Sequence, residues 1–525
     1  MDLMERSDVP YTEGAPECVS SDQKGYCGCS MRRIADCVPL NYRQEALQVL
    51  KLAGPVVISQ MMVFLISIIS MVFCGHLGKT ELAAVSLAAA VVNVSGVSIG
   101  TGLSATCDTL ISQTFGSGNL KRVGVILQRG VLILLLACFP CWAMLVNTEP
   151  LLLAVKQSSE VARPHLCINC KGSTFKISGS AAANAISQYI LALLLFAYII
   201  WRGLHKATWG GWSMDCLQEW GLFVRLAIPS MLMICLSWWM FEIGGFLAGI
   251  ISETELGAQS IAYQLCIVAY MFPLGFSVAA SVRVGNALGA GKVEQAKLSC
   301  KVPIICAFIC ACFVGASLSL ARHVIGYIFT TEHDIIQRVS EVMLLFGFMH
   351  IGDATAGVAA GILRGAGKQL IGALCNLVGL YFIGFPIGVS LMFAAKMGIM
   401  GMWTGLTICV FLQCTVFIII LYKLDWTKAA KEAFERAGIQ VQNEQSNSED
   451  SDLIHMGVGT APSIQCAEET EEGPSHNQMF TTTTTVGDIL PKRALVLRRS
   501  LTLMLMMVIL ISGITTSELL MTLFN

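Results

Sequence analysis

Eleven long apolar stretches constrain this 525-residue chain more than any other feature of its sequence. A helix that crosses a bilayer needs about 20 predominantly apolar residues, and each stretch approaches or exceeds that length. The stretches lie at 53–73, 84–107, 123–145, 179–200, 226–251, 257–280, 301–321, 335–362, 370–394, 401–423 and 500–515. Only 13% of the residues are charged, about half of the share that covers a soluble protein. We therefore predict an all-α polytopic membrane protein embedded in a lipid bilayer.

Basic residues concentrate in alternate loops between these stretches. One set of loops carries Lys121, Arg122, Arg202, Lys206, Arg283, Lys292, Lys297, Lys301, Arg364, Lys368, Lys423, Lys428 and Lys431. Loops that border the cytosol are enriched in Lys and Arg. We therefore expect these loops and the N-terminus to be cytosolic, and the C-terminus to be extracellular. The first 44 residues have no basic segment followed by an apolar core, so a cleaved signal peptide is not predicted.

The two halves of the chain resemble each other. The sequence Leu-Ala-Gly-Pro, which ends at Pro55, recurs as Leu-Ala-Ile-Pro, which ends at Pro229, at an offset of 174 residues. Further along, Gly179 best matches Gly401, at an offset of 222. About 48 residues, the length of two spans with short loops, are thus absent from the first half after Ala162. Duplicated six-span halves are typical of secondary transporters.

These features divide the chain into six segments. They are a cytosolic tail (1–44), a truncated first bundle (45–201), a cytosolic inter-bundle linker (202–225), a second bundle (226–424), a disordered cytosolic linker (425–494) and a C-terminal transmembrane helix (495–525). The last linker is rich in Glu, Ser, Thr and Gln, which cannot bury enough apolar surface to fold. The two bundles are expected to be pseudo-symmetric, with two of six helices lacking from the first.

Two classes of partner are not predicted. A net charge of −1 provides no electrostatic footprint for nucleic acid. The glycine-rich stretch 285–292 resembles a P-loop, but its spacing is one residue too long and Val293 replaces the Ser or Thr, so no nucleotide site is predicted. A metal site is not predicted either, because the paired cysteines at 27/29 and 167/170 lack a second pair.

Several stretches resemble the multidrug and toxin extrusion (MATE) transporters of vertebrates. They include CGHLGKTELAAVSLA (74–88), TCDTLISQTFGS (106–117), ATWGGWS (207–213), SVAASVRVGNALGAG (277–291) and GILRGAGKQ (361–369). The resemblance implies two six-helix bundles, a thirteenth helix, and exchange of organic cations for protons by a transporter rather than an enzyme. It implies a proton gradient as the driving force, with no cofactor, and the apical plasma membrane of excretory epithelia. We expect a monomer whose partners are small organic cations, protons and lipid.

An acidic residue inside an apolar span is costly to bury and is therefore a functional candidate. Glu242 lies mid-span in the sequence Ser237-Trp238-Trp239-Met-Phe241-Glu242. A carboxyl group there can bind a proton or a cation but gains little from binding both, which is the minimum chemistry of antiport. Trp238, Trp239 and Phe241 can add cation–π contacts. The alternative is that the aromatic rings only pack and that Glu242 is structurally paired.

Further candidates lie in other spans. His350 and Asp353 are three residues apart and share a helix face. The resemblance supports both as proton or cation ligands, and the alternative for His350 is a hydrogen-bonded packing role. Gln60 is a candidate for the first-half cavity, and Asp108 is expected to cap a neighbouring helix. The sequon at Asn93 lies within a span and is expected to stay unglycosylated.

Two positions depart from the family pattern. Vertebrate members usually carry a carboxylate just before the Trp pair, where this chain has Ser237, and another after the next tyrosine, where Gln264 follows Tyr263. We expect Tyr263 and Gln264 to line the substrate cavity, and the departures leave the proton stoichiometry open. Two alternatives to an active antiporter remain: a transport-impaired splice form or gene model of the same family, and a lipid or glycan flippase of similar architecture.

Overall fold

The computed structural model describes residues 40–75, 89–148, 171–441, 480–486 and 490–524. The chain divides into two compact units, residues 1–44 and 45–525, and only the first residues of helix α2 represent the smaller unit in the described part. Within the described part ten helices are long and apolar enough to cross a membrane, and an eleventh has a shorter apolar part, Ala185–Trp201. All eleven predicted spans are thus helical where they are described, which confirms the all-α polytopic fold class.

The first half of the chain contributes four of these spans. Its elements are α2 (Leu40–Gly75), η1 (Asn93–Val97), α4 (Ser98–Gly116), α5 (Leu120–Val146) and α8 (Lys171–Trp201). The π-helical turn η1 continues directly into α4, so the two form one span. The prediction of missing helices after Ala162 falls in a stretch, 149–170, that lies outside the described residues.

The second half contributes six spans. Its elements are η2 (Met214–Leu217), α9 (Trp220–Ile251), α10 (Glu253–Gly289), α11 (Val293–Ile325), η3 (Gly326–Ile328), α12 (His333–Gly365), α13 (Gln369–Asn376), η4 (Leu377–Gly384), α14 (Phe385–Val389), η5 (Ser390–Ala394) and α15 (Ile399–Lys423). The elements from α13 to η5 form a single span. Pro386 has no backbone N–H to donate, and the π turns η4 and η5 on either side keep this span continuous.

Helices α10 and α12 form the centre of the second half. They pack along each other and against α11, while α10 also contacts α4 and α9. Gly361 and Gly365 of α12 lie against Ser277 and Ser281 of α10, where a Cβ atom would collide with backbone. Small residues at such positions allow helices in a membrane to approach closely. The close contact explains why the spans of α10 and α12 are the most buried in the described part.

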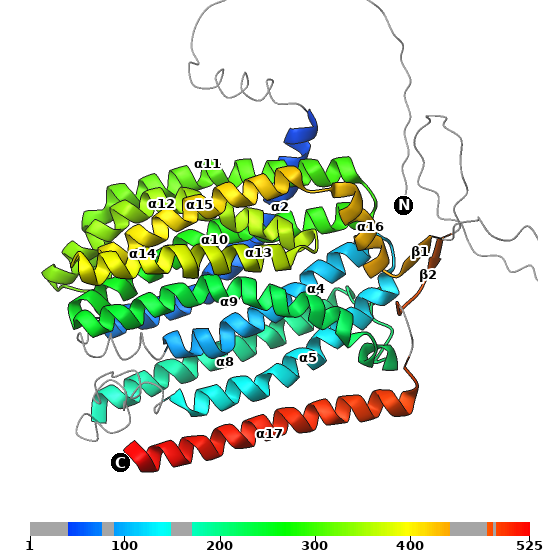
Figure 1. Ribbon diagram of the computed structural model, residues 1–525, viewed down its shortest axis with the longest axis horizontal. Coiled ribbons are helices and arrows are strands. Elements are labelled where there is room, and N and C mark those ends of the chain that lie inside the picture. The colour runs from blue at the N-terminus through cyan, green and yellow to red at the C-terminus, as the bar shows by residue number, and fades with distance from the viewer. Residues whose placement is uncertain (1–39, 76–88, 149–170, 442–479, 487–489, 525) are drawn as a thin grey trace, which may run out of the picture. The chain divides into compact units, whose positions relative to one another are not determined.

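The predicted clustering of basic residues corresponds to one end of the helices, which we name the basic end (Figure 1, near α16). It contains Lys121, Arg122, Arg283, Lys292, Arg364, Lys368 and Lys423. Here α4 of the first half meets α12 of the second. Gln113 Nε2 donates to the carbonyl of Gly365 (2.8 Å), and Thr109 Oγ1 donates to the carbonyl of Arg364 (3.0 Å). The two halves are therefore joined at the basic end.

The expectation of a disordered linker over 425–494 needs correction at both of its ends. Helix α16 (Trp426–Arg436) is capped by Asp425, whose carboxylate accepts from the Lys428 backbone N–H at 3.0 Å. The buried positions of α16 are Trp426, Ala429, Ala430 and Ala433, a helical i, i+3, i+4, i+7 pattern that packs on α4, α10 and α11. The polar composition of the whole segment concealed this short amphipathic helix. Residues 442–479 lie outside the described part.

The far end of that segment is also ordered. Strands β1 (Ile439–Val441) and β2 (Phe480–Thr482) pair antiparallel, and the next four residues, Thr483–Val486, form an extension that we name the strap. Asn119 Nδ2 donates to the carbonyl of Thr483 (2.9 Å), and Arg122 Nη1 donates to that of Thr484 (2.6 Å). The backbone N–H of Val486 donates to Glu219. The strap thus lies on the start of α5 and on the residue before α9.

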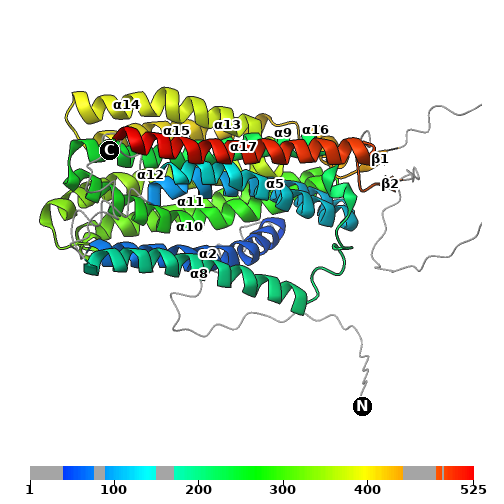
Figure 2. The same cartoon turned by 90° about the horizontal axis from the view of Figure 1, so that it is seen from below.

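The last helix, α17 (Lys492–Phe524), packs on α5 of the first half (Figures 1 and 2). Asn147 Nδ2 donates to the carbonyl of Gly513 (2.8 Å), and Ser517 Oγ donates to that of Val146 (3.1 Å). Helix α8 differs sharply from α17. Within 185–201 every side chain of α8 is exposed except Ser187 and Leu191, which are half-buried.

Candidate functional site

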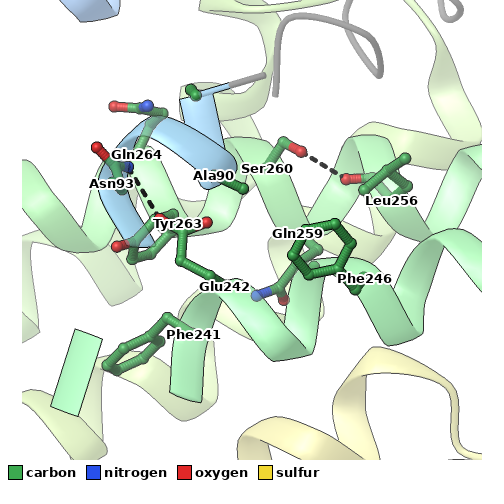
Figure 3. A pocket seen from close by; sticks show the side chains of 12 residues that line it. Ala90, Asn93, Phe241, Glu242, Phe246, Leu256, Gln259, Ser260, Tyr263 and Gln264 are labelled. Atoms are coloured by element: carbon green, nitrogen blue, oxygen red, sulfur yellow. Dashed lines mark hydrogen bonds between the residues drawn. The ribbon is translucent and has the colours of Figure 1, made fainter. Parts of the chain in front are cut away.

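A small pocket lies between η1 of the first half and helices α9 and α10 of the second (Figure 3). Its lining includes Asn93, Phe241, Glu242, Gln259, Tyr263 and Gln264. The space that a water centre can occupy is about 40 Å³. One water needs about 10–15 Å³ by this measure, so the pocket has room for a few waters but not for an organic cation.

Glu242 is the acidic group of this pocket. It is 6% exposed, and its Oε1 accepts a hydrogen bond of 2.9 Å from Nδ2 of Asn93, drawn as a dashed line in Figure 3. The hydroxyl of Tyr263 donates to the same carboxyl group. Both donors are neutral, and no basic side chain forms an ion pair with Glu242 in the described part of the chain. The carboxyl group is therefore solvated by dipoles rather than neutralised by a fixed positive charge.

Aromatic rings form one wall of the pocket. Phe241 stacks on Tyr263, with ring centroids 5.6 Å apart and planes 15° from parallel, and lies 5.9 Å from Trp403. The indole N–H of Trp403 donates to Gln259 Oε1 at 2.8 Å. Phe241 is thus held between two rings, while its neighbour Glu242 faces the pocket. Phe241 thus packs against other rings and also lines the pocket. Its packing does not exclude a contact with a cation.

The two tryptophans before Phe241 do not line the pocket. The indole N–H of Trp239 is directed to the first half, where it donates to Ser98 Oγ at 2.9 Å. Trp238 is half-buried, and Gln60 of α2 is half-buried and lies outside the lining. Asp108 lies inside α4, where its electrostatic partner is Arg364. The expected capping contact of Asp108 is not among its described interactions.

Ser237 belongs to a neutral polar cluster. Asn376 of α13 donates from Nδ2 to Ser237 Oγ (2.8 Å) and to the carbonyl of Met233 (2.6 Å), and its Oδ1 accepts from Gln413. Gln264, the second departure from the family pattern, lines this small pocket and is 8% exposed. Its side-chain carbonyl oxygen has no hydrogen-bond partner in the described part. The lining of the pocket therefore includes an amide oxygen that has no hydrogen-bond partner among the described residues.

His350 and Asp353 both lie on α12. His350 is fully buried, neither ring nitrogen has a hydrogen-bond partner among the described residues, and its ring lies 5.3 Å from that of Phe346. Asp353 has Tyr270 of α10 as an electrostatic neighbour. Cys266, three residues after Tyr263, is a further electrostatic neighbour of Asp353. Neither Asp353 nor His350 belongs to the lining of the Glu242 pocket.

Three residues of the pocket region were missed from the sequence: Asn93, Gln259 and Trp403. Asn93 was considered only as part of a sequon, although a polar residue inside a span is itself a signal. Gln259 and Trp403 gave no comparable signal, because their partnership joins α10 to α15 across 144 residues of sequence.

A family model supports the internal repeat. The MatE model matches the chain twice, over residues 55–165 and 229–390. The two matches begin at Pro55 and Pro229, which also mark the start of the repeat. The first match is about 50 residues shorter than the second, in agreement with the shortening predicted for the first half.

Relatives at high identity extend over almost the whole chain. The sequence is 53% identical to multidrug and toxin extrusion protein 1 of Danio rerio, over 95% of each chain. It is 46% identical to multidrug and toxin extrusion protein 2 of Mus musculus, over 90% of this chain and 91% of the relative. The first alignment has 562 positions, more than the 525 residues of this chain, so the relative has residues with no counterpart here.

A solved structure shares the fold. The crystal structure of the eukaryotic MATE transporter AtDTX14 is similar with a TM-score of 0.70 and 27% sequence identity. The similarity covers 76% of this chain and 100% of that one.

Proposed function

Because this chain belongs to the MATE family of multidrug and toxin extrusion transporters, we propose that it exports organic cations across the plasma membrane in exchange for protons. The observation that carries this proposal is the buried carboxyl group of Glu242, which has hydrogen-bond donors but no basic partner in the described part. A proton gradient drives the exchange, and the protein acts as a monomer without a cofactor.

The exchange follows from competition at one carboxyl group. The ionised Glu242 attracts an organic cation, and the aromatic wall of Phe241 and Tyr263 adds cation–π attraction. The unused carbonyl oxygen of Gln264 can accept a hydrogen bond from a protonated amine. Protonation of Glu242 removes its charge and weakens the attraction, so that the entry of a proton releases the cation.

Binding of an organic cation requires the pocket to widen. The first half supplies Asn93 and the second half supplies Glu242, so separation of the halves breaks their hydrogen bond and opens space beside the carboxyl group. Such separation, alternating between the two ends of the helices, is the proposed alternating access. In this proposal, the hydrogen bond of Glu242 depends on whether the two halves are together or apart.

We orient the protein with the basic end in the cytosol, which places the N-terminus inside and the C-terminus outside. A cation that arrives from the cytosol must then pass the contacts at the basic end. These include Gln113 with Gly365, and the strap with Arg122 and Glu219. Asp353 and His350 are proposed as a second proton site in the core of the second half, near Tyr270.

The test replaces Glu242 in two ways. Glu242→Gln retains the size and hydrogen-bonding capacity of the side chain but cannot ionise, so pH-driven uptake of tetraethylammonium into membrane vesicles should fall to background. Glu242→Asp is the matched control and should retain pH-dependent uptake, since it keeps an ionisable group. Both are normalised to surface protein measured by biotinylation. Unchanged uptake by Glu242→Gln would remove this residue from the exchange.

One observation favours the alternative of a transport-impaired form. Almost every side chain of helix α8 is exposed over 185–201, and the family match in the first half is shortened. A first half with four spans leaves the cavity without part of its wall. Comparison with a chain in which the spans are restored separates the two possibilities, as described in the Discussion.

A further inference from the structure

A groove at the basic end combines aliphatic walls with lysine side chains. Its volume is about 350 Å³, and it shares no residue with the Glu242 pocket. The apolar lining comes from Ile371 of α13 and from Ile419, Ile420 and Leu424 at the end of α15. The charged lining comes from Lys368, Lys423, Asp425 and Lys428.

The charges in the groove are not balanced internally. Lys368 Nζ contacts both carboxylate oxygens of Glu432 at 2.8 Å. Lys423 and Lys428 are exposed, and neither forms an ion pair in the described part of the chain. Asp425 uses one carboxylate oxygen to cap α16. Two lysine ammonium groups are therefore available to an anion, with Asp425 as the opposing charge.

The location of the groove indicates which kind of anion would bind there. Ile371 and Ile419 belong to candidate membrane spans that end here, Gln369–Ala394 and Ile399–Lys423, and both side chains are partly exposed. The apolar wall therefore begins among lipid chains, and the lysines lie at the helix ends, where lipid headgroups lie. A ligand that complements both parts has an anionic head joined to an apolar chain.

We propose that this groove binds an anionic phospholipid, with its phosphate at Lys423 and Lys428 and an acyl chain along Ile371 and Ile419. Basic pockets between transmembrane helices on the cytosolic side are suited to such headgroups. Lys428 belongs to α16, which packs on α4 and α10 and whose Arg436 donates to Gln113 Oε1 at 3.1 Å. Lipid in the groove therefore stabilises α16 against the first half at the basic end.

The experiment uses the full chain in nanodiscs that contain phosphatidylcholine with a minority of phosphatidylglycerol. Native mass spectrometry counts the phosphatidylglycerol that stays bound. The double variant Lys423→Gln/Lys428→Gln should lose this retained lipid, with a decrease in affinity of about fivefold for each lysine. Lys431→Gln is the matched control, because Lys431 is also an exposed lysine of α16 but lies outside the groove.

A variant that removes a negative charge from the groove should change lipid binding in the opposite direction. Asp425→Asn retains a capping side chain for α16 but removes the opposing negative charge, so it should bind phosphatidylglycerol more tightly than the wild type. If the double variant fails to fold, Asp425→Asn and the single variant Lys423→Gln still give opposite expected shifts. Retention that is equal in the wild type and the lysine variants would overturn the proposal. An equal loss in Lys431→Gln, or displacement of the lipid by inorganic phosphate, would also contradict it.

Discussion

Helices α8 and α15 occupy equivalent places in the repeat but differ in their surroundings. Gly179 of α8 matches Gly401 of α15 in the sequence. Helix α15 packs against α12, α13, η4, α14 and η5, and Trp403 and Cys409 on it are fully buried. Helix α8 has almost every side chain exposed over 185–201. Two helices at matching positions of the repeat therefore differ in their degree of burial.

The difference in burial between α8 and α15 indicates which contacts hold a transmembrane helix in place. The partners of α15 are α12 and the span from α13 to η5, which are the two spans without counterparts in the first half. Lipid solvates apolar side chains as well as another helix does, so helices in a membrane are held by close packing and hydrogen bonds rather than by hydrophobicity. An apolar helix without its partners can still cross the membrane, but it contributes little to the wall of a cavity.

The largest expected effect comes from restoring the partners of α8. Insertion of the corresponding residues of the Danio rerio relative after Ala162 should pack α8 and raise cation flux on the order of tenfold, since packing lost from one bundle shifts the population of competent molecules. Tetraethylammonium uptake, normalised to biotinylated surface protein, measures the change. Equal flux per surface molecule would mean that the second half alone carries cation and proton.

A matched pair of truncations tests the comparison directly. Leu421 of α15 is 5% exposed, and Ile199, at the equivalent position of α8, is 42% exposed. Leu421→Ala should lower the free energy of unfolding by about 2–4 kcal/mol because it leaves a cavity, whereas Ile199→Ala should change it by less than about 0.5 kcal/mol. Thermal unfolding of the purified protein measures both. Similar losses in the two variants would show that α8 is packed after all.

A smaller effect is expected at the strap, which joins the start of α5 to the residue before α9. Val486→Pro removes the N–H that donates to Glu219, at a cost of about 1.5–3 kcal/mol for a hydrogen bond to a charged group. Val486→Ala is the control, because it shortens the side chain but retains that N–H. Release of the strap should uncover Cys216, which is 5% exposed. The residue before it, Asp215, accepts a hydrogen bond of 3.2 Å at Oδ2 from the Thr484 hydroxyl of the strap.

The rate of Cys216 labelling by a maleimide is the measurement for the strap. Burial raises the pKa of the Cys216 thiol, so the reactive thiolate is scarce at neutral pH in the closed form. Exposure in Val486→Pro should lower that pKa toward the ordinary thiol value of about 8.5 and increase labelling. The difference in thiolate between Val486→Pro and Val486→Ala should be largest in the alkaline range above that value, where the exposed thiol is ionised and the closed thiol is still protonated. The labelled peptide is identified by mass spectrometry. Identical rates in both variants would show that the strap does not cover this cysteine.

Much of the architecture could be predicted from the sequence because it depends on local composition. In a bilayer every backbone polar group must be satisfied within its own segment, so a long apolar stretch becomes a helix whatever its neighbours are. The repeat and its shortening are likewise patterns of sequence alone. A carboxyl group inside such a stretch, as at Glu242, is conspicuous for the same reason. Tyr263 and Gln264, identified through the family resemblance, also line the pocket.

What the tertiary structure decided is which residues meet. Asn93 reaches Glu242 across 149 residues of sequence, and Asp353 does not line that pocket although both carboxyl groups occupy spans of the same half. The amphipathic helix α16 and the strap acquire order only by packing on other elements. These outcomes depend on the faces that helices present to each other, and in lipid those faces are set by packing and hydrogen bonds, which the apolar pattern of a single span does not encode.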